Sequence, residues 1–189
     1  GILYVLPGLF PGLPWSDAVF ADAGPGTRVL IVLMALMAVL IAVYPGLLLF
    51  ESLAVPFWAS ALVPLLFFAY AIMSGMALMF ALTSGAHALA WGLGLSLVAS
   101  LLLTWLYLHT IVRNAPTAAK EARRRLTSGR WAWLFWLTIV VGQLVPLVLL
   151  LAGLSSTAAH WVIAVLVLAG AFGLRYVQLL AGLLKSPLG

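Results

Sequence analysis

Five apolar stretches, each long enough to cross a lipid bilayer, constrain the fold of this chain more than any other feature of its sequence. A hydrocarbon core about 30 Å thick is crossed by a helix of about 20 residues. The stretches are residues 28–50, 57–82, 88–112, 133–153 and 160–182. Hydrophobic residues make up 66% of the chain and charged residues 7%, which is too few to hydrate a soluble surface. Residues 29–43 are apolar on all sides, whereas barrel strands alternate, so we predict an all-α, polytopic membrane helix bundle.

The segment before the first stretch has two parts. Residues 1–10 are apolar but too short to span, and we interpret them as the end of a truncated helix. A short interfacial or signal-like segment is the alternative, although no basic region precedes it. Residues 11–27 contain helix-breaking prolines and glycines together with Asp17 and Asp22, and they predict an extracytoplasmic loop. The predicted organisation is therefore 1–27 followed by a transmembrane bundle, 28–189.

Basic residues are concentrated between the third and fourth stretches. Residues 113–130 carry six of them against the single acid Glu121: Arg113, Lys120, Arg123, Arg124, Arg125 and Arg130. The positive-inside rule places this segment and the carboxyl terminus in the cytoplasm. The net charge of +5 then reflects topology and contact with anionic lipid rather than with nucleic acid. The triple arginine is internal, so we interpret it as a solvated face and not as an export signal.

Ionisable groups in or beside the spans are few, and such groups mark functional sites by default. Glu51, His109 and Arg175 are expected at similar depth on the cytoplasmic side, where they would form a charge-compensated network or a proton relay. The alternative is that Glu51 and His109 reach the interface from their helix ends. Arg175 is deeper and needs an acceptor, so a Glu51–Arg175 pair is the specific prediction.

Several kinds of prosthetic group are excluded from this chain. It has no cysteine, so it supplies no thiolate to an iron–sulfur cluster or a zinc site. His87 and His160 are expected at the outer ends of their helices and His109 alone at the inner side, so no histidine pair is available for haem. We predict neither haem nor metal in this chain. No catalytic motif of a complete enzyme is present either.

Prolines, small residues and tryptophans predict details of the packing. Pro45, Pro64 and Pro146 each remove a backbone donor, which predicts kinks in the first, second and fourth helices. Small residues at four-residue spacing predict a surface against which a neighbouring helix packs: Gly92, Ser96, Ser100 and Thr104. Tryptophans near predicted span ends are interpreted as interfacial anchors: Trp15, Trp58, Trp91, Trp131, Trp133 and Trp161.

The segment from Tyr44 to Gly75 has a recognisable order of motifs. It reads Y-x-G-x-L-L from Tyr44, P-x-W from Pro56, P-L-L-F from Pro64, and S-G at its end. This order resembles the NrfD/PsrC family, the quinone-reactive membrane subunits of polysulfide and nitrite reductase complexes. Gly173-Leu-Arg-Tyr176 followed by Gly182 resembles the closing segment of that family. The resemblance implies eight helices in all, of which these five would be the last five.

The resemblance implies a non-autonomous subunit of a quinone-linked oxidoreductase of the polysulfide, nitrite or DMSO reductase type, active in anaerobic respiration. It would lie in a bacterial or archaeal cytoplasmic membrane and take menaquinone or ubiquinone as substrate. Its partners would be a four-cluster, ferredoxin-like iron–sulfur subunit and a molybdopterin or multihaem cytochrome subunit. Candidate quinone-pocket residues are Tyr44, Tyr70, Ser74 and Gln143, with interhelical hydrogen bonding as the alternative role of the last three. A small multi-pass transporter component and a purely structural anchor are the alternative functions.

Overall fold

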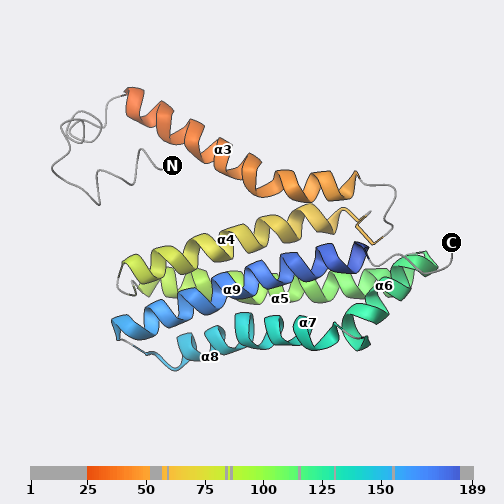
Figure 1. Ribbon diagram of the computed structural model, residues 1–189. Helices are drawn as coiled ribbons and strands as arrows, with labels where there is room; N and C mark the ends of the chain where they lie inside the picture. The colour runs from red at the N-terminus through yellow and green to blue at the C-terminus, as the bar shows by residue number, and fades with distance from the viewer. Residues whose placement is uncertain are drawn as a thin grey trace. The chain divides into compact units, whose positions relative to one another are not determined.

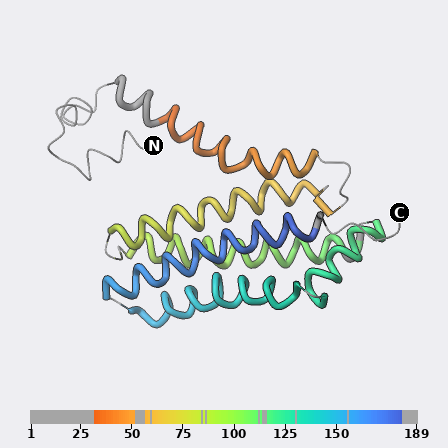
Figure 2. The backbone as a smooth tube through the Cα atoms, in the orientation of Figure 1, coloured from red at the N-terminus to blue at the C-terminus, as the bar shows by residue number. Residues whose placement is uncertain are grey.

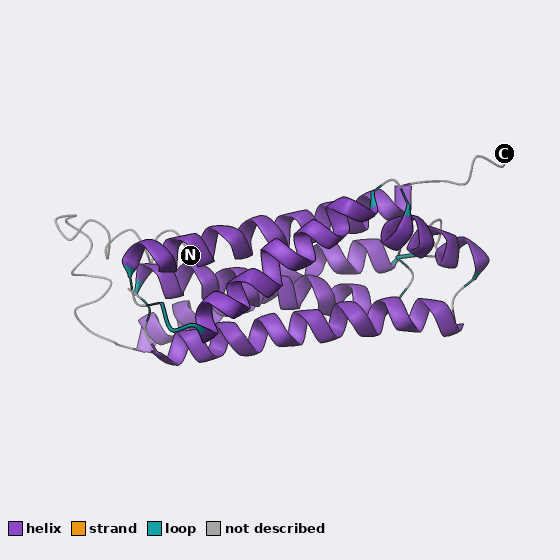
Figure 3. Cartoon of the chain, turned by 90° about the horizontal axis from the view of Figure 1, so that it is seen from below, coloured by secondary structure: helices purple, strands orange, loops and turns teal. Residues whose placement is uncertain are grey.

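The computed structural model describes residues 25–51, 57–58, 60–83, 85, 87–114, 116–129, 131–154 and 156–183. Within these ranges all regular structure is helical, and Figure 3 shows short loops joining the helices at their ends. The helices are α3 (Pro25–Phe50), α4 (Leu62–Leu82), α5 (His87–Asn114), α6 (Thr117–Ser128), α7 (Ala132–Ile139), η1 (Val140–Leu144), α8 (Val145–Leu151) and α9 (Thr157–Leu183). The predicted end of a truncated helix at 1–10 and most of the predicted loop at 11–27 lie outside the described residues.

Five segments of the described helices are long and apolar enough to cross a membrane. They are Val32–Phe50, Leu62–Leu82, His87–Ile111, Ala132–Leu151 and Thr157–Ala181. The predicted all-α bundle with five spans is thereby confirmed. The first helix begins at Pro25, three residues inside the expected loop, because the missing N–H of proline costs nothing at the first position of a helix.

The chain divides into two compact units, Gly1–Ala42 and Val43–Gly189. The described residues of the first unit are the first part of α3. In the second unit α4 packs against α5 and α9, and α9 also packs against α7 and η1 (Figure 1). The buried residues of α4 recur at helical spacing, with Leu66, Tyr70, Met73 and Ala77 each fully enclosed. They form the centre of the core.

The row of small residues on α5 faces α4, as predicted. A Cβ added to Gly92 would lie 3.1 Å from the terminal methyl of Met76, and the Ser100 hydroxyl oxygen lies 3.4 Å from the sulfur of Met73. Thr104 lies one turn further along and contacts Tyr70. Small side chains therefore let the two helices approach closely along this row.

The fourth span contains a π-helical turn. The helices α7, η1 and α8 follow one another as a single continuous rod (Figure 2). The N–H of Val145 donates to the carbonyl of Val140, five residues earlier. Pro146 follows directly and has no N–H with which to bond the carbonyl of Gly142. The predicted distortion at Pro146 thus takes the form of a π-turn.

The prediction for Pro64 was wrong. Helix α4 begins at Leu62 rather than at residue 57, so Pro64 lies in its first turn, where the backbone N–H groups have no partner within the helix. Proline at that place neither breaks a hydrogen bond nor bends the helix. The hydroxyl of Ser60 accepts the N–H of Leu62 at 3.4 Å and marks the true start.

The basic segment 113–130 contains a helix, α6. Its sequence, Thr117–Ser128, is rich in alanine, arginine and other good helix formers. Ala119, Ala122 and Leu126 are buried, whereas Lys120 and Arg124 are exposed, so the helix is amphipathic. It contacts α5, α7 and α9 at one end of the bundle.

Candidate functional site

A buried polar pair joins α4 to α5. The hydroxyl oxygens of Tyr70 and Thr104 lie 2.9 Å apart, and the two residues are 0% and 5% exposed. The Thr104 hydroxyl donates to the carbonyl of Ser100 at 2.7 Å. A threonine hydroxyl has one hydrogen, so Tyr70 is the donor in the pair and Thr104 the acceptor.

Helix α9 adds a charged group to this pair. Nη2 of Arg175 donates to the carbonyl of Phe67 at 3.3 Å, and the guanidinium lies 5.7 Å from the centre of the Phe67 ring. Nε of Arg175 is buried and has no protein partner. The positive charge of Arg175 is close enough to the Tyr70 hydroxyl to interact with it electrostatically. The Gln178 side chain lies beside the same hydroxyl. Tyr70, Thr104, Arg175 and Gln178 are hereafter called the Tyr70 cluster.

The Tyr70 cluster is held in place from the segment before α4. Nε1 of Trp58 donates to the backbone carbonyl of Gln178 at 3.0 Å. The Tyr107 hydroxyl donates to the carbonyl of Phe57, and the two rings meet edge to face with centroids 5.5 Å apart. Trp58 is therefore a buried residue that links α9 to the segment just before α4. Its prediction as an interfacial anchor was wrong.

The predicted network of Glu51, His109 and Arg175 is not assembled in this structure. Glu51 is exposed beyond the end of α3, and half-buried His109 stacks on Trp105 with ring centroids 5.1 Å apart. Among the described residues the ion pairs are those that Glu121 makes. Arg175 instead donates to the Phe67 carbonyl and lies over the Phe67 ring.

The four predicted pocket residues lie in different environments. Tyr70 is in the cluster, and the Ser74 hydroxyl donates to the Tyr70 carbonyl at 2.7 Å within α4. Tyr44 is 60% exposed. Gln143 is 0% exposed, and neither its amide nitrogen nor its amide oxygen has a protein partner. Among these four residues, the hydrogen bond described joins Ser74 to Tyr70.

Gln143 belongs to the π-turn of the fourth span. Next to it, Gly142 meets Gly170 of α9 so closely that a Cβ on Gly142 would lie 2.3 Å from the Cα of Gly170. The Gln143 side chain is fully buried beside this contact in sequence, and Pro146 leaves the Gly142 carbonyl without its usual donor. The middle of the span thus carries polar groups that the helix itself does not satisfy.

Sequence reasoning missed Thr104, Tyr107, Gln178 and Trp58 as members or supports of the cluster. Helical spacing offered a signal for two of them, since Ser100, Thr104 and Tyr107 recur at intervals of four and three on one face of α5. No comparable signal links Trp58 to Gln178, because the contact joins residues 120 positions apart.

The described residues contain no group of three histidine, cysteine or acidic side chains able to hold a metal ion. A sequence model described as polysulphide reductase, NrfD, matches residues 10–186, almost the whole chain. The chain belongs to the NrfD family. This family comprises membrane subunits of quinone-interacting oxidoreductase complexes. Comparison with curated proteins and comparison with solved structures each give no match.

The Tyr70 cluster of this NrfD chain contains one donor and one acceptor that are buried without a protein partner. A quinone carbonyl accepts hydrogen bonds, and a quinol hydroxyl also donates them. Nε of Arg175 is a buried donor without a protein partner, and Oε1 of Gln178, one turn further along α9, is a buried acceptor without one. Apolar side chains that reach the outside surround Arg175 on the same helix, namely Phe172, Tyr176 and Leu179. Arg175 itself is half-buried, so it lies at the edge of the cluster.

Proposed function

We propose that this NrfD chain passes electrons between the membrane quinone pool and an iron–sulfur subunit docked on the membrane. The observation that carries the proposal is the family match over residues 10–186, combined with a buried donor and acceptor on α9. A bound quinone carries two electrons and two protons between its quinone and quinol forms. In this proposal the electrons pass to or from iron–sulfur centres on the partner, since this chain has no cysteine to bind such a cluster.

Arg175 is the residue that orients the head group in this proposal. Its Nη2 is already bonded to the Phe67 carbonyl, which fixes the plane of the guanidinium and leaves Nε for a quinone oxygen. Tyr70 and Thr104 are buried and hydrogen-bonded to each other, and in this proposal they form the protein side of the site next to Arg175. The apolar tail of the quinone lies along the exposed aromatic and aliphatic surface of α9.

The partners and the membrane are part of the same proposal. The partner set consists of a ferredoxin-like iron–sulfur subunit with a molybdopterin or multihaem cytochrome subunit, and the substrate is menaquinone or ubiquinone. In this proposal, the end of the bundle that carries the basic helix α6 lies on the cytoplasmic side of a bacterial or archaeal cytoplasmic membrane, which the positive-inside rule favours. The Tyr70 cluster lies in the half of the bundle nearest α6, because Arg175 and Gln178 belong to the last third of α9 (Figure 1).

The test is the purification of the full-length protein from its native membrane in mild detergent, with co-purifying chains, iron content and quinol oxidation measured together. An iron-containing partner and inhibitor-sensitive quinol oxidation are expected. A preparation without iron and without quinol activity would refute the function and favour a transporter instead.

The residue-level claim needs a separate variant. Arg175→Gln keeps a donor but removes the charge, and we expect roughly tenfold or greater loss of quinol oxidation with an unchanged set of co-purifying chains. Arg124→Gln on exposed α6 removes the same charge far from the cluster and serves as the control. Full activity of Arg175→Gln would remove Arg175 from the quinone site and leave the subunit function standing.

A further inference from the structure

The helix α6 lies at the level where a membrane meets water. It connects α5, which ends at Asn114, to α7, which begins at Ala132, and both belong to predicted spans. Nε1 of Trp136, an exposed residue in the second turn of α7, donates to the carbonyl of Thr127 at 3.1 Å. Exposed tryptophans near span ends sit among lipid head groups. The contact between Trp136 and Thr127 therefore places the end of α6 at head-group depth.

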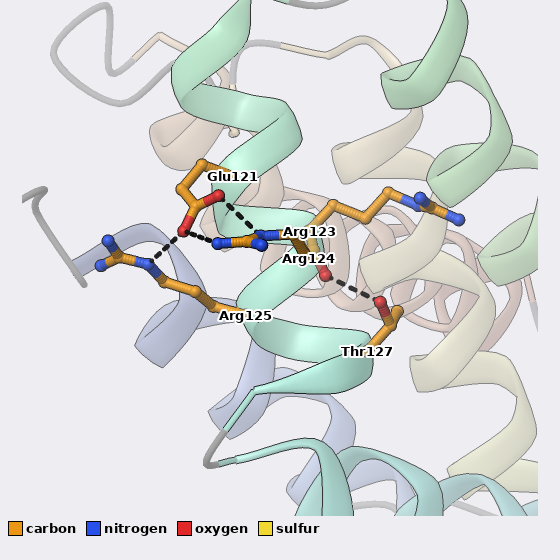
Figure 4. Close-up of polar contacts among 5 residues, drawn as sticks. All are labelled: Glu121, Arg123, Arg124, Arg125 and Thr127. Atoms are coloured by element: carbon orange, nitrogen blue, oxygen red, sulfur yellow. Dashed lines mark hydrogen bonds and ion pairs between the residues drawn. The ribbon is translucent and has the colours of Figure 1, made fainter.

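The three consecutive arginines of α6 have different environments. Glu121 binds Nε of Arg124 at 2.9 Å and Nε of Arg125 at 3.0 Å. Figure 4 shows Arg123 pointing away from Glu121, to the other side of the helix. Arg123 is half-buried, and its Nε is enclosed without a protein partner. The single acid of α6 is thus used by two arginines, and the third has no anion among the described residues.

The Arg123 side chain is partly covered by protein. It is half-buried beside the buried face of α6 formed by Ala119, Ala122 and Leu126, and its Nε is enclosed. Covering part of a guanidinium without supplying an anion is unfavourable. A group held in this way at head-group depth is a binding site for an anion that comes from outside the chain.

We propose that Arg123 binds the phosphate of an anionic phospholipid, assisted by Lys120. Guanidinium groups pair with phosphate through parallel hydrogen bonds, and amphipathic basic helices at the membrane surface attract anionic lipids. Lys120 lies three residues before Arg123, on the neighbouring turn of the same face, and is exposed. The proposal depends on the membrane embedding of the chain and is independent of its reaction with quinone.

The experiment compares two variants that lose the same charge. The full-length protein, Arg123→Gln and Arg124→Gln are placed in nanodiscs of phosphatidylcholine with and without phosphatidylglycerol. Retained lipid is counted by native mass spectrometry, and thermal unfolding is followed by tryptophan fluorescence. We expect phosphatidylglycerol to be retained by the parent and by Arg124→Gln, and to be held roughly tenfold or more weakly by Arg123→Gln.

Three outcomes would overturn the proposal. Equal weakening in both variants would show a diffuse charge effect, and no preference for phosphatidylglycerol in the parent would show that no such site exists. Retention of lipid by Arg123→Gln with loss of a co-purifying subunit would assign Arg123 to a protein carboxylate. Binding measured with inorganic phosphate in place of the lipid shows whether the site is one for free phosphate. A cooperative thermal unfolding transition of Arg123→Gln in phosphatidylcholine alone shows that this variant folds.

Discussion

Replacement of Gly170 by alanine tests the closest helix contact in the bundle. A Cβ on Gly170 would lie 2.4 Å from the Cα of Gly142 and 2.9 Å from its carbonyl carbon and oxygen. Ordinary contact distances are roughly 1 Å longer than the first of these, and the obstructing atoms belong to backbone, which cannot rotate away. Overpacking of this kind costs about 1–3 kcal/mol, and alanine regains about 0.5–1 kcal/mol through its better helix propensity. We therefore expect Gly170→Ala to lower the free energy of unfolding by up to about 2.5 kcal/mol.

The same substitution at Gly94 is the matched control. Gly94 also lies inside a spanning helix, but a Cβ there would meet no heavy atom within 4 Å. Gly94→Ala should raise the free energy of unfolding by about 0.5–1 kcal/mol. The assay is thermal unfolding in mild detergent, followed by the fluorescence of the eight tryptophans. If Gly170→Ala were as stable as Gly94→Ala, the close approach of η1 to α9 would be refuted.

Two further predictions concern polar groups. Gln143→Leu removes a fully buried amide that has no protein partner. The substitution should raise the free energy of unfolding by about 1–3 kcal/mol, measured by the same thermal unfolding assay. A decrease would show that the amide holds a ligand such as water. Hydrogen bonds from Arg124 and Arg125 lower the pKa of Glu121. The ionised Glu121 side chain therefore contributes its full stabilisation above the pKa of an ordinary glutamate. That stabilisation is lost as the pH falls through the lowered pKa. The difference in unfolding temperature between the parent and Glu121→Gln should accordingly disappear in acid, and a difference that grows in acid would contradict the assigned ion pairs.

The spans could be predicted from sequence because burial in lipid requires only length and apolar composition. Distortions within a span depend on more than one residue. Pro64 and Pro146 carry the same chemistry, yet only Pro146 accompanies a distortion, because α4 begins two residues before Pro64. Helix α6 was not predicted because the basic residues of segment 113–130 were interpreted only as a signal of membrane topology. The alanines and arginines of this segment favour a helix.

The candidate site was predictable only in part, since it depends on which helix faces pack together. Tyr70 and Arg175 were identified because polar groups are rare in the spans. Their partners were not, because a carbonyl such as that of Phe67 exists at every residue and gives no sequence signal. The predicted Glu51–Arg175 pair rested on charge and expected depth, whereas Arg175 donates to the neutral carbonyl of Phe67 and Glu51 is exposed.

Arg175 and Arg123 lie in different parts of the protein, but both are positively charged groups without a paired carboxylate among the described residues. In each, Nε is buried without a protein partner, and neither residue pairs with a described carboxylate. The chain has nine basic residues and four acids, of which Asp17 and Asp22 lie outside the described residues and Glu121 is already bonded to two arginines. The described part of the chain therefore leaves both guanidinium groups partly desolvated without a pairing carboxylate, and removal of either charge relieves that cost. It follows that Arg175→Gln and Arg123→Gln should weaken binding of quinone and of lipid, respectively, without loss of stability in neutral detergent, the opposite of what residues with only a structural role would do.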